Sequence, residues 1–355
     1  MTVKGIAIKN VYYMLSYAFK ALRQGVYERV ERESFEHAEE LFAGILAIGL
    51  GYVTKRGLHR SYEARVDDLK VLRGRIDLGR TIGLVAARRQ AISCRYDEFS
   101  VNNSFNQVLK TTALLLLRSG SAMKNAATLK RALLPLGEVD EIDLRRFRWS
   151  SLRFERNNQH YLMLINVCRM VAEGLLMTEG RRDGSNAFRK FELDEKVMAS
   201  LYEAFIREYY ARHYKLGARA AQIDWAIGND DDGSLLPRMQ SDITLSDEHH
   251  KLIIDAKFYT RTLQDHFGKY SVHSHNLYQI LAYVNNEQAN DRDREVGGML
   301  LYAKTDEAAQ PNVDVTIGGR RVQVCTLDLS QPFEKISQQL DAVVADYFKG
   351  ALRYV

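Results

Sequence analysis

Two neighbouring stretches decide the fold of the second half of the chain: "RMQSDITL" (238–245) and "KLIIDAKFY" (251–259). Both are rich in β-forming residues and only a short polar run separates them, which predicts an antiparallel hairpin. Alternate side chains of a strand share a face, so Asp255 and Lys257 should stand side by side. Two charges at the end of an apolar strand indicate either a functional site or a surface ion pair.

The hairpin supplies a second carboxylate. A register in which paired residue numbers sum to about 497 places Asp242 opposite Asp255, with Cβ atoms roughly 5 Å apart. Paired carboxylates repel and one pKa rises, unless a hard divalent ion takes oxygen ligands from both. The pair therefore predicts an Mg²⁺ site, which Mn²⁺ could also fill. Lys257 could steer or deprotonate a water, or stabilise charge on phosphorus, so the expected chemistry is phosphodiester hydrolysis.

Helical patterns flank the hairpin. The run 194–214 repeats apolar residues at i, i+4 and i+8 and predicts a helix. The run 274–286 predicts another, with Gln279 and Tyr283 four residues apart on one face. Further along we expect a buried strand, a hairpin turning at Gly318 and Gly319, and a terminal helix over 332–349. The expected fold is α+β or α/β, with a central mixed sheet flanked by helices.

The N-terminal part reads as mixed and mainly helical. Helices are expected from Asn10, which we take as an N-cap, and over about 35–54, 101–119 and 158–178. Residues 62–82 alternate like strands around Gly74. The glycine-rich and charged run 178–186 is the expected linker, which gives two domains, residues 1–184 and 185–355.

Composition narrows the class of protein. The chain has 355 residues, 46% of them hydrophobic, and three cysteines without a CxxC pair. These features predict two globular domains in a reducing cytoplasm, with no disulfide scaffold and no membrane span. Residues 1–184 carry 30 Lys and Arg against 20 Asp and Glu, whereas the remainder has 20 against 25. The basic excess indicates either a polyanion or acidic partner, or simply a solvated surface.

Several strings resemble one protein family. The helix, D…DAK hairpin and QxxxY helix resemble the PD-(D/E)XK nuclease superfamily, in particular its RecB-like branch. The strings "KNVYYMLSYAF", "LRGRIDLGRTI", "LLPRMQSDITL", "LIIDAKFY" and "HSHNLYQILAYV", in this order, resemble the McrC family. Its members are the nuclease subunits of McrBC methylcytosine restriction systems, which act in antiviral defence. The resemblance spans nearly the whole chain.

The resemblance implies roles for the residues singled out above. Asp242 and Asp255 would be metal ligands and Lys257 would lie beside the scissile phosphate, with Gln279 and Tyr283 positioning DNA and the catalytic groups. Some relatives use a helix glutamate as a further ligand, for which Glu203 is the candidate. Glu208 is the second choice.

The resemblance also implies partners. The chain would be an Mg²⁺-dependent endodeoxyribonuclease acting on double-stranded DNA, with its N-terminal domain docked on an McrB-like AAA+ GTPase hexamer. The sequence has no GxxxxGK[ST] string of its own to hold nucleotide phosphates. Two alternatives remain open: a non-catalytic adaptor that activates a ring NTPase, and an autonomous RecB-like nuclease.

Other polar residues match no site pattern. His249 and His250 read as turn residues, whereas His273 and His275 precede the helix of Gln279 and could reach a phosphate. The cysteines lie in apolar contexts and are expected to pack in the core. The run "DDDG" (230–233) reads as a solvated turn.

Overall fold

The computed structural model describes most of the chain, as two compact units. The described residues are 2–3, 6–19, 35, 37–120, 123–179, 195–228, 233–259, 261–266, 269–351 and 353–354. One unit contains Met1–Leu41 and Asn186–Val355, and the other contains Phe42–Ser185. Within the described part of the chain, no helix combines the length and apolarity needed to traverse a bilayer.

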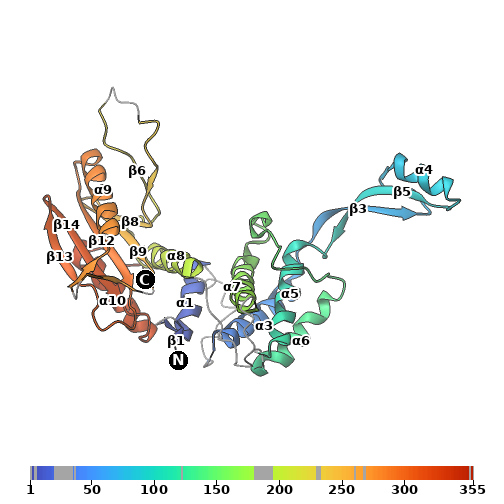
Figure 1. Cartoon of the computed structure of the whole chain (residues 1–355), viewed down its shortest axis with the longest axis horizontal. Helices are drawn as coiled ribbons and strands as arrows, with labels where there is room; N and C mark the ends of the chain where they lie inside the picture. The colour runs from blue at the N-terminus through green and yellow to red at the C-terminus, as the bar shows by residue number, and fades with distance from the viewer. Residues whose placement is uncertain are drawn as a thin grey trace. The chain divides into compact units, whose positions relative to one another are not determined.

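The first unit is built on a five-stranded mixed sheet (Figure 1). Its strands, in spatial order, are β13 (Val313–Ile317), β14 (Arg320–Leu327), β12 (Glu295–Ala303), β9 (His250–Lys257) and β8 (Ile243–Ser246). The three central strands run parallel, and each edge strand is antiparallel to its neighbour. The central β12 is buried along almost its whole length, as a strand covered on both faces must be.

Helices cover both faces of this sheet. They are α8 (Glu195–His213), α9 (Ser274–Asn290) and α10 (Phe333–Tyr347), whereas α1 (Ile8–Ala18) packs against α8. Two adjacent glycines of β12 show the layering, because successive residues of a strand point to opposite faces. A Cβ on Gly298 would lie 2.7 Å from Val284 of α9, and one on Gly297 would lie 2.6 Å from Tyr347 of α10. Helices α9 and α10 therefore press on opposite faces.

The core between the sheet and α9 is apolar and closely packed. Its buried members are Ile223, Met239, Ile253, Ile280, Tyr283, Val284, Val296, Leu300, Tyr302, Val322 and Val324. The other face is filled by aromatic residues of α8, of which Tyr202 donates to Leu301 O of β12 and Tyr210 to Leu340 O of α10. The mixed sheet flanked by helices confirms the expected fold class at this level.

The N-terminal helix packs within the first unit. Asn10 is not the expected N-cap, because α1 begins at Ile8; the buried Asn10 side chain donates instead to Leu329 O (2.7 Å) and Gln331 O (2.8 Å). The ring of Tyr13 stacks on Phe333 of α10, with centroids 4.2 Å apart. The first 41 residues thus differ from the expected division, which placed them in an N-terminal domain ending at residue 184.

Short paired segments complete the first unit. They are β1 (Thr2–Val3) with β2 (Ile6–Ala7), β6 (Gln222–Ile223) with β7 (Met239–Gln240), and β10 (Leu263–His266) with β11 (Lys269–Val272). Gly318 and Gly319 join β13 to β14 with positive φ angles of 58° and 77°, which fits the expected type I′ turn.

The second unit is mainly helical, as expected. Its helices are α3 (Ala38–Arg56), α4 (Leu78–Ala86), α5 (Ser104–Arg118), α6 (Ala126–Leu133) and α7 (Leu162–Glu179), and its strands are β3 (Ser61–Leu69), β4 (Arg75–Ile76) and β5 (Ile92–Ser100). Asn103 caps α5 by accepting from Asn106 N. Helix α7 continues to Glu179, and the rest of the expected linker, residues 180–186, lies outside the described residues.

Strands β3, β5 and β4 form a separate small sheet that carries α4, and we call these four elements the arm. Burial along β3 alternates, as its sequence predicts. Residues 78–82 form part of a helix rather than a strand, because Asp77 caps it through Arg80 N and Leu78, Ile82 and Val85 recur at helical spacing. None of the residues of α4 is buried.

Candidate active site

The β8–β9 hairpin has the register expected from the sequence. Ile243 pairs with Ile254 and Thr244 with Ile253, and continuing this register by one residue places Asp242 opposite Asp255. The Asp242 carboxylate also accepts a hydrogen bond from Ala256 N at 2.8 Å. The two aspartates therefore meet at one end of the hairpin.

Asp255 and Lys257 face α9. Ile253, two residues earlier on β9, belongs to the core beneath α9, and the period of two puts Asp255 and Lys257 on the same face. Asp255 is only 2% exposed. Its Oδ2 lies 2.7 Å from Lys257 Nζ, an ion-pair distance, yet it accepts no well-oriented hydrogen bond within the described part of the chain. A buried carboxylate oxygen is thus left with capacity for a further electropositive ligand.

The two carboxyl groups influence each other's protonation. Burial raises the pKa of Asp242 to about 7, helped by the negative charge of Asp255 and by a hydrogen bond with it; Ala256 N and Lys257 act in the opposite direction. Near neutral pH, without a cation, the pair therefore tends to keep a proton. A divalent ion would supply the missing positive charge in the proton's place.

Lys257 is held as a cation. Burial alone would lower its pKa, but the negative charge of Asp255, whose Oδ2 lies 2.7 Å from Lys257 Nζ, outweighs burial, so the pKa of Lys257 is raised. Its Nζ also donates to Gln279 Oε1 on α9 at 3.2 Å. A raised pKa disfavours this amine as a resting proton acceptor and favours it as a fixed positive charge.

Helix α9 supports the lysine through a second residue. Gln279 Nε2 donates to the hydroxyl oxygen of Tyr283 at 2.8 Å, and Tyr283 is 8% exposed. The amide of Gln279 is thereby oriented with its oxygen toward Lys257. The structure brings together all five of the expected residues on the hairpin and α9.

Three residues near this site were not singled out from the sequence. Asn276, fully buried in the first turn of α9, donates to Tyr302 Oη at 2.8 Å and accepts from Tyr259 Oη at 3.3 Å. Tyr302 of β12 pairs with Lys257 of β9 in the sheet register. Together they tie the start of α9 to the strand ends that carry the site. The sequence feature that could have pointed to Asn276 is a polar residue at a core-facing position of the helix, three residues before Gln279.

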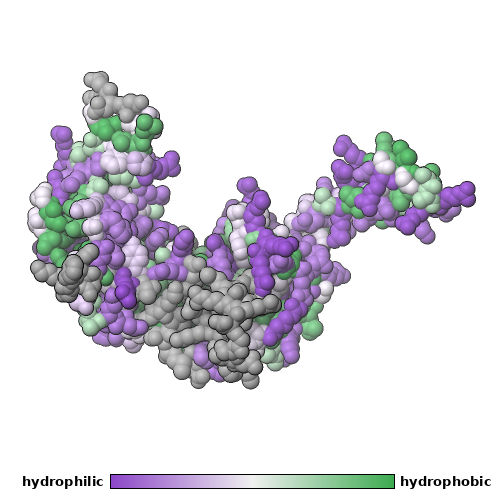
Figure 2. Space-filling model, in the orientation of Figure 1, coloured by the Kyte–Doolittle hydropathy of each residue, from purple (hydrophilic) through white to green (hydrophobic). Residues whose placement is uncertain are grey.

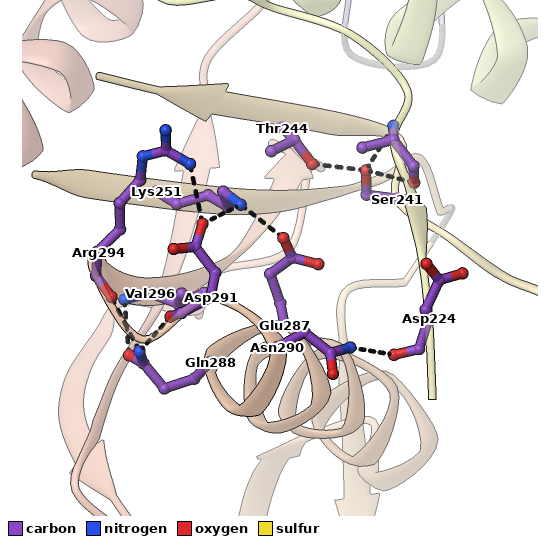
Figure 3. Close-up of polar contacts among 11 residues, drawn as sticks. Asp224, Ser241, Thr244, Lys251, Glu287, Gln288, Asn290, Asp291, Arg294 and Val296 are labelled. Atoms are coloured by element: carbon purple, nitrogen blue, oxygen red, sulfur yellow. Dashed lines mark hydrogen bonds and ion pairs between the residues drawn. The ribbon is translucent and has the colours of Figure 1, made fainter. Parts of the chain in front are cut away.

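The far end of α9 is fixed by charges (Figure 3). Lys251 at the start of β9 is buried, and its Nζ lies 2.6 Å from both Glu287 Oε1 and Asp291 Oδ2. Asp291 also pairs with Arg294, at 2.9 Å. The hydrogen bond from Lys251 lowers the pKa of Asp291. Helix α9 is therefore held at both ends against the strands that present Asp255 and Lys257.

Glu203 lies near the carboxylate pair but does not join it. Burial raises the pKa of this α8 residue to about 7, and the charge of Asp242 raises it further, while Lys257 and Arg207 oppose the shift. Among the described residues, no three His, Cys, Asp or Glu side chains lie close enough together to hold a metal ion.

The remaining polar residues take up other positions. His249 and His250 lie at the β8–β9 turn, where both backbone N–H groups donate to Asp247. His273 and His275 stand at the start of α9, their rings 5.6 Å apart. Cys94 and Cys168 are buried and Cys325 is half-buried, all three as free thiols. Asp230, Asp231 and Asp232 of the "DDDG" run lie outside the described residues.

The donor set at the hairpin end fits a hard divalent ion. Asp242 and Asp255 offer carboxylate oxygens, and Oδ2 of Asp255 is buried and accepts no well-oriented hydrogen bond from the described residues. Burial, and next the charge of Asp255, raise the pKa of Asp242, and a bound cation would oppose both effects. Mg²⁺ commonly binds through one or two carboxylates and fills its other positions with water and phosphate oxygens. Two protein ligands are therefore enough for this ion.

Comparison with known proteins identifies relatives. Residues 5–303 match the family model described as "McrBC 5-methylcytosine restriction system component". The chain is 26% identical over 348 residues to the Escherichia coli K12 protein "Type IV methyl-directed restriction enzyme EcoKMcrBC", covering 97% of this chain and 99% of that protein.

Two solved structures are also similar. A chain of the half-complex of Thermococcus gammatolerans McrB AAA+ hexamers with bound McrC matches with a TM-score of 0.48 and 17% identity, over 96% of this chain and 75% of that one. A chain of the McrBC complex from the same organism matches with a TM-score of 0.39 and 22% identity, over 58% of each chain. At these values the likeness is too distant to carry an argument about this chain.

Proposed function

This chain belongs to the family of McrBC 5-methylcytosine restriction system components, and we propose that it is the DNA endonuclease subunit of such a system. The observation that carries the proposal is the pair formed by the half-buried Asp242 and the buried Asp255 beside a charged lysine. A purely structural hairpin end gains nothing from two adjacent carboxylates, one of which has its pKa raised to about 7. We propose that the first unit is a PD-(D/E)XK nuclease domain.

Asp242 and Asp255 would hold the metal ion, Mg²⁺ or Mn²⁺ by ligand type. When bound, the ion would polarise the scissile phosphate and acidify a water molecule. Glu203 would reach it only through an intervening water, because Glu203 does not converge with the two aspartates. Glu208 receives no role in this proposal.

Lys257 would bind a non-bridging oxygen of the scissile phosphate and stabilise the charge that develops on it. Its raised pKa supports this role over that of a base. Gln279 would fix the direction of the ammonium group, and Tyr283 would fix the amide of Gln279. The α9 pair is thus assigned to positioning rather than to bond breaking.

The second unit would dock on a partner. The chain belongs to a family of restriction system components, and its E. coli relative carries the name of a methyl-directed restriction enzyme, EcoKMcrBC. We propose that this chain is cytoplasmic and that it binds an McrB-like AAA+ GTPase hexamer and stimulates it, as the resemblance to the McrC family implies. The arm is the candidate surface, because apolar side chains are exposed on its strands, in the turn between β3 and β4, and on α4 (Figure 2). They include Tyr62, Val71, Leu72, Leu78, Ile82, Val85 and Phe99. Exposed apolar side chains gathered in this way mark interaction surfaces.

A cleavage assay tests the nuclease proposal. The chain would be purified with its neighbouring NTPase and given methylated duplex DNA, GTP and Mg²⁺. Asp255→Asn should abolish cleavage and leave stimulation of the partner's GTPase intact. Asp247→Asn, the same change at the other end of the hairpin, is the matched control and should cut normally. Cleavage by Asp255→Asn at the wild-type rate would overturn the assignment and leave the adaptor alternative.

A further inference from the structure

The second unit contains a segment with an unusual density of arginines. Residues 145–156, between α6 and α7, include Arg145, Arg146, Arg148, Arg153 and Arg156, all exposed. We call these residues the arginine segment. The only acidic residue within it is Glu155. The segment contributes to the basic excess of residues 1–184, and the proposed nuclease and docking surfaces leave it without a role.

The arginines alternate with apolar residues that point inward. Phe147, Trp149, Leu152 and Phe154 are half-buried, whereas Arg146, Arg148 and Arg153 beside them are exposed. Arg148 and Leu152 have extended backbones, in which neighbouring side chains project to opposite sides. The apolar side chains therefore face the unit and the guanidinium groups face solvent.

Several contacts fix this arrangement. The ring of Phe154 packs edge-on against Phe105 of α5, with centroids 5.4 Å apart. Asn158 accepts from Glu155 N at 2.7 Å and donates to Arg153 O at 3.1 Å. A short 3-10 helix, Trp149–Ser151, closes with Ser151 N donating to Arg148 O. The guanidinium groups are thus carried on an ordered backbone.

The charge of the segment is poorly neutralised. Elsewhere in the second unit, Arg65, Arg95 and Arg118 pair with carboxylates at 3.0, 3.2 and 2.9 Å. In contrast, the side chains of Arg148, Arg153 and Arg156 form no ion pair with any described residue. Arg146 reaches Asp143 only at 3.7 Å, with 90% of its side chain exposed. Unpaired guanidinium groups on a fixed framework are suited to oxyanions, which they bind through paired N–H donors.

We propose that the arginine segment binds the phosphate backbone of duplex DNA, at a site distinct from the Asp242–Asp255 hairpin. The inference rests on the proposed function, which makes DNA the substrate. An acidic protein surface is disfavoured, because none of the large apolar side chains in the segment is fully exposed, and protein interfaces are built around such anchors. Backbone contacts of this kind hold DNA irrespective of sequence and weaken steeply with salt.

The test measures binding without cleavage. The full-length chain in EDTA would be titrated into a labelled 30-base-pair duplex, with fluorescence anisotropy read at several KCl concentrations. The test variant combines Arg148→Gln, Arg153→Gln and Arg156→Gln. Each phosphate contact contributes about 0.9 to the slope of log affinity against log salt, so the slope should fall by about two to three. Affinity at about 100 mM KCl should fall at least tenfold.

Two further variants control the result. Lys55→Gln, Lys130→Gln and Arg131→Gln together remove the same charge from exposed positions of the same unit and should bind nearly as the wild type does. Replacing the three segment arginines by lysine should preserve most of the salt slope. Unchanged melting temperatures would show that all variants are folded.

The outcomes separate this proposal from the nuclease assignment. The DNA-binding proposal would be overturned if the triple glutamine variant kept the wild-type affinity and salt slope. It would also be overturned if the matched control lost as much affinity, or if the wild-type chain did not bind DNA. If the triple glutamine variant lost binding to the NTPase but still bound DNA, the segment would be assigned to a protein partner, and the DNA-binding proposal would again be overturned. Failure of the nuclease assignment would be seen in a different experiment, the cleavage assay, in which Asp255→Asn would then cut DNA as fast as the wild type.

Discussion

The charge state of Asp242 ties the site to pH. Its pKa in the folded chain is raised to about 7, above the model-compound value of 3.8. A carboxyl with a raised folded-state pKa contributes stability that is complete below pH about 4 and is lost as the pH rises through about 7. The metal-free protein should therefore be less stable at pH 8 than at pH 5.

A single substitution should remove this loss. The asparagine side chain of the Asp242→Asn variant cannot ionise. In EDTA at pH 8, the unfolding free energy of this variant should therefore exceed that of the wild type by on the order of 1 kcal/mol, since one pKa unit corresponds to about 1.4 kcal/mol. The gain should shrink toward pH 5. Urea denaturation at the two pH values measures it, and a gain independent of pH would contradict the electrostatic explanation.

Tyr283 offers a test of the positioning role of α9. Tyr283→Phe removes the oxygen that receives a hydrogen bond from Gln279 and leaves the ring in the core. Losing one hydrogen bond of about 1 kcal/mol should lower kcat about fivefold, with DNA affinity unchanged. Tyr278→Phe on the same helix, where the side chain is exposed, should have no effect. Equal rates for the two variants would show that Tyr283 does not act on the reaction through Gln279.

The residues of the site differ in how far sequence could predict them. Asp242 could be placed opposite Asp255 because hairpin pairing follows from strand alternation and turn length, which are local. The distance between Glu203 and that pair could not be predicted from the sequence, because it depends on how α8 crosses the edge of the sheet. Asn276 was missed for a similar reason, since its partners Tyr259 and Tyr302 come from other elements.

At the level of elements, the position of α9 depends on Lys251. Lys251→Met would leave Glu287 and Asp291 without their shared cation. Breaking a buried pair of this kind costs roughly 3–5 kcal/mol, which urea denaturation should detect. Lys304→Met removes a pair with Asp328 whose lysine is 43% exposed, and it should cost no more than about 1 kcal/mol. Similar losses in the two variants would show that the Lys251 cluster is not a special support for α9.

Secondary-structure elements were predicted best where the chain pattern is regular. The hairpins and the helices of the first unit follow from periodicity and turn glycines. The order of the five strands could not be predicted in this way, because β9 and β12 pair in parallel although all of α9 lies between them in the sequence. Gly298 shows what sequence could not convey: a side chain there would displace α9, which approaches β12 at that residue.

For the whole molecule, the main difference from expectation is the place of the N-terminus. Helix α1 has the amphipathic pattern of many helices, and nothing local reveals that its partners Leu329, Gln331 and Phe333 lie more than 300 residues away. The composition of 178–186 does mark a change between units. The unit that we propose to dock on the partner is therefore Phe42–Ser185 rather than a domain that begins at residue 1.

The arm gives a prediction about assembly. Ile82→Ser combined with Val85→Ser makes the exposed face of α4 polar without touching a buried residue. Co-elution with the NTPase partner should fall at least tenfold, and the melting temperature should change little. Leu235→Ser, at a 96% exposed position of the first unit, serves as the control and should leave assembly intact. Normal assembly of the Ile82 and Val85 variant would exclude the arm as the docking surface.

The most direct test of the account is whether the aspartate pair holds a divalent ion. Mn²⁺ binding to the full-length chain can be followed through the loss of the electron paramagnetic resonance signal of the free ion. The wild type and Asp247→Asn should bind Mn²⁺ with the same affinity, and binding should strengthen as the pH rises through about 7. Asp255→Asn should lose this site. Undiminished Mn²⁺ binding by Asp255→Asn would contradict the central claim.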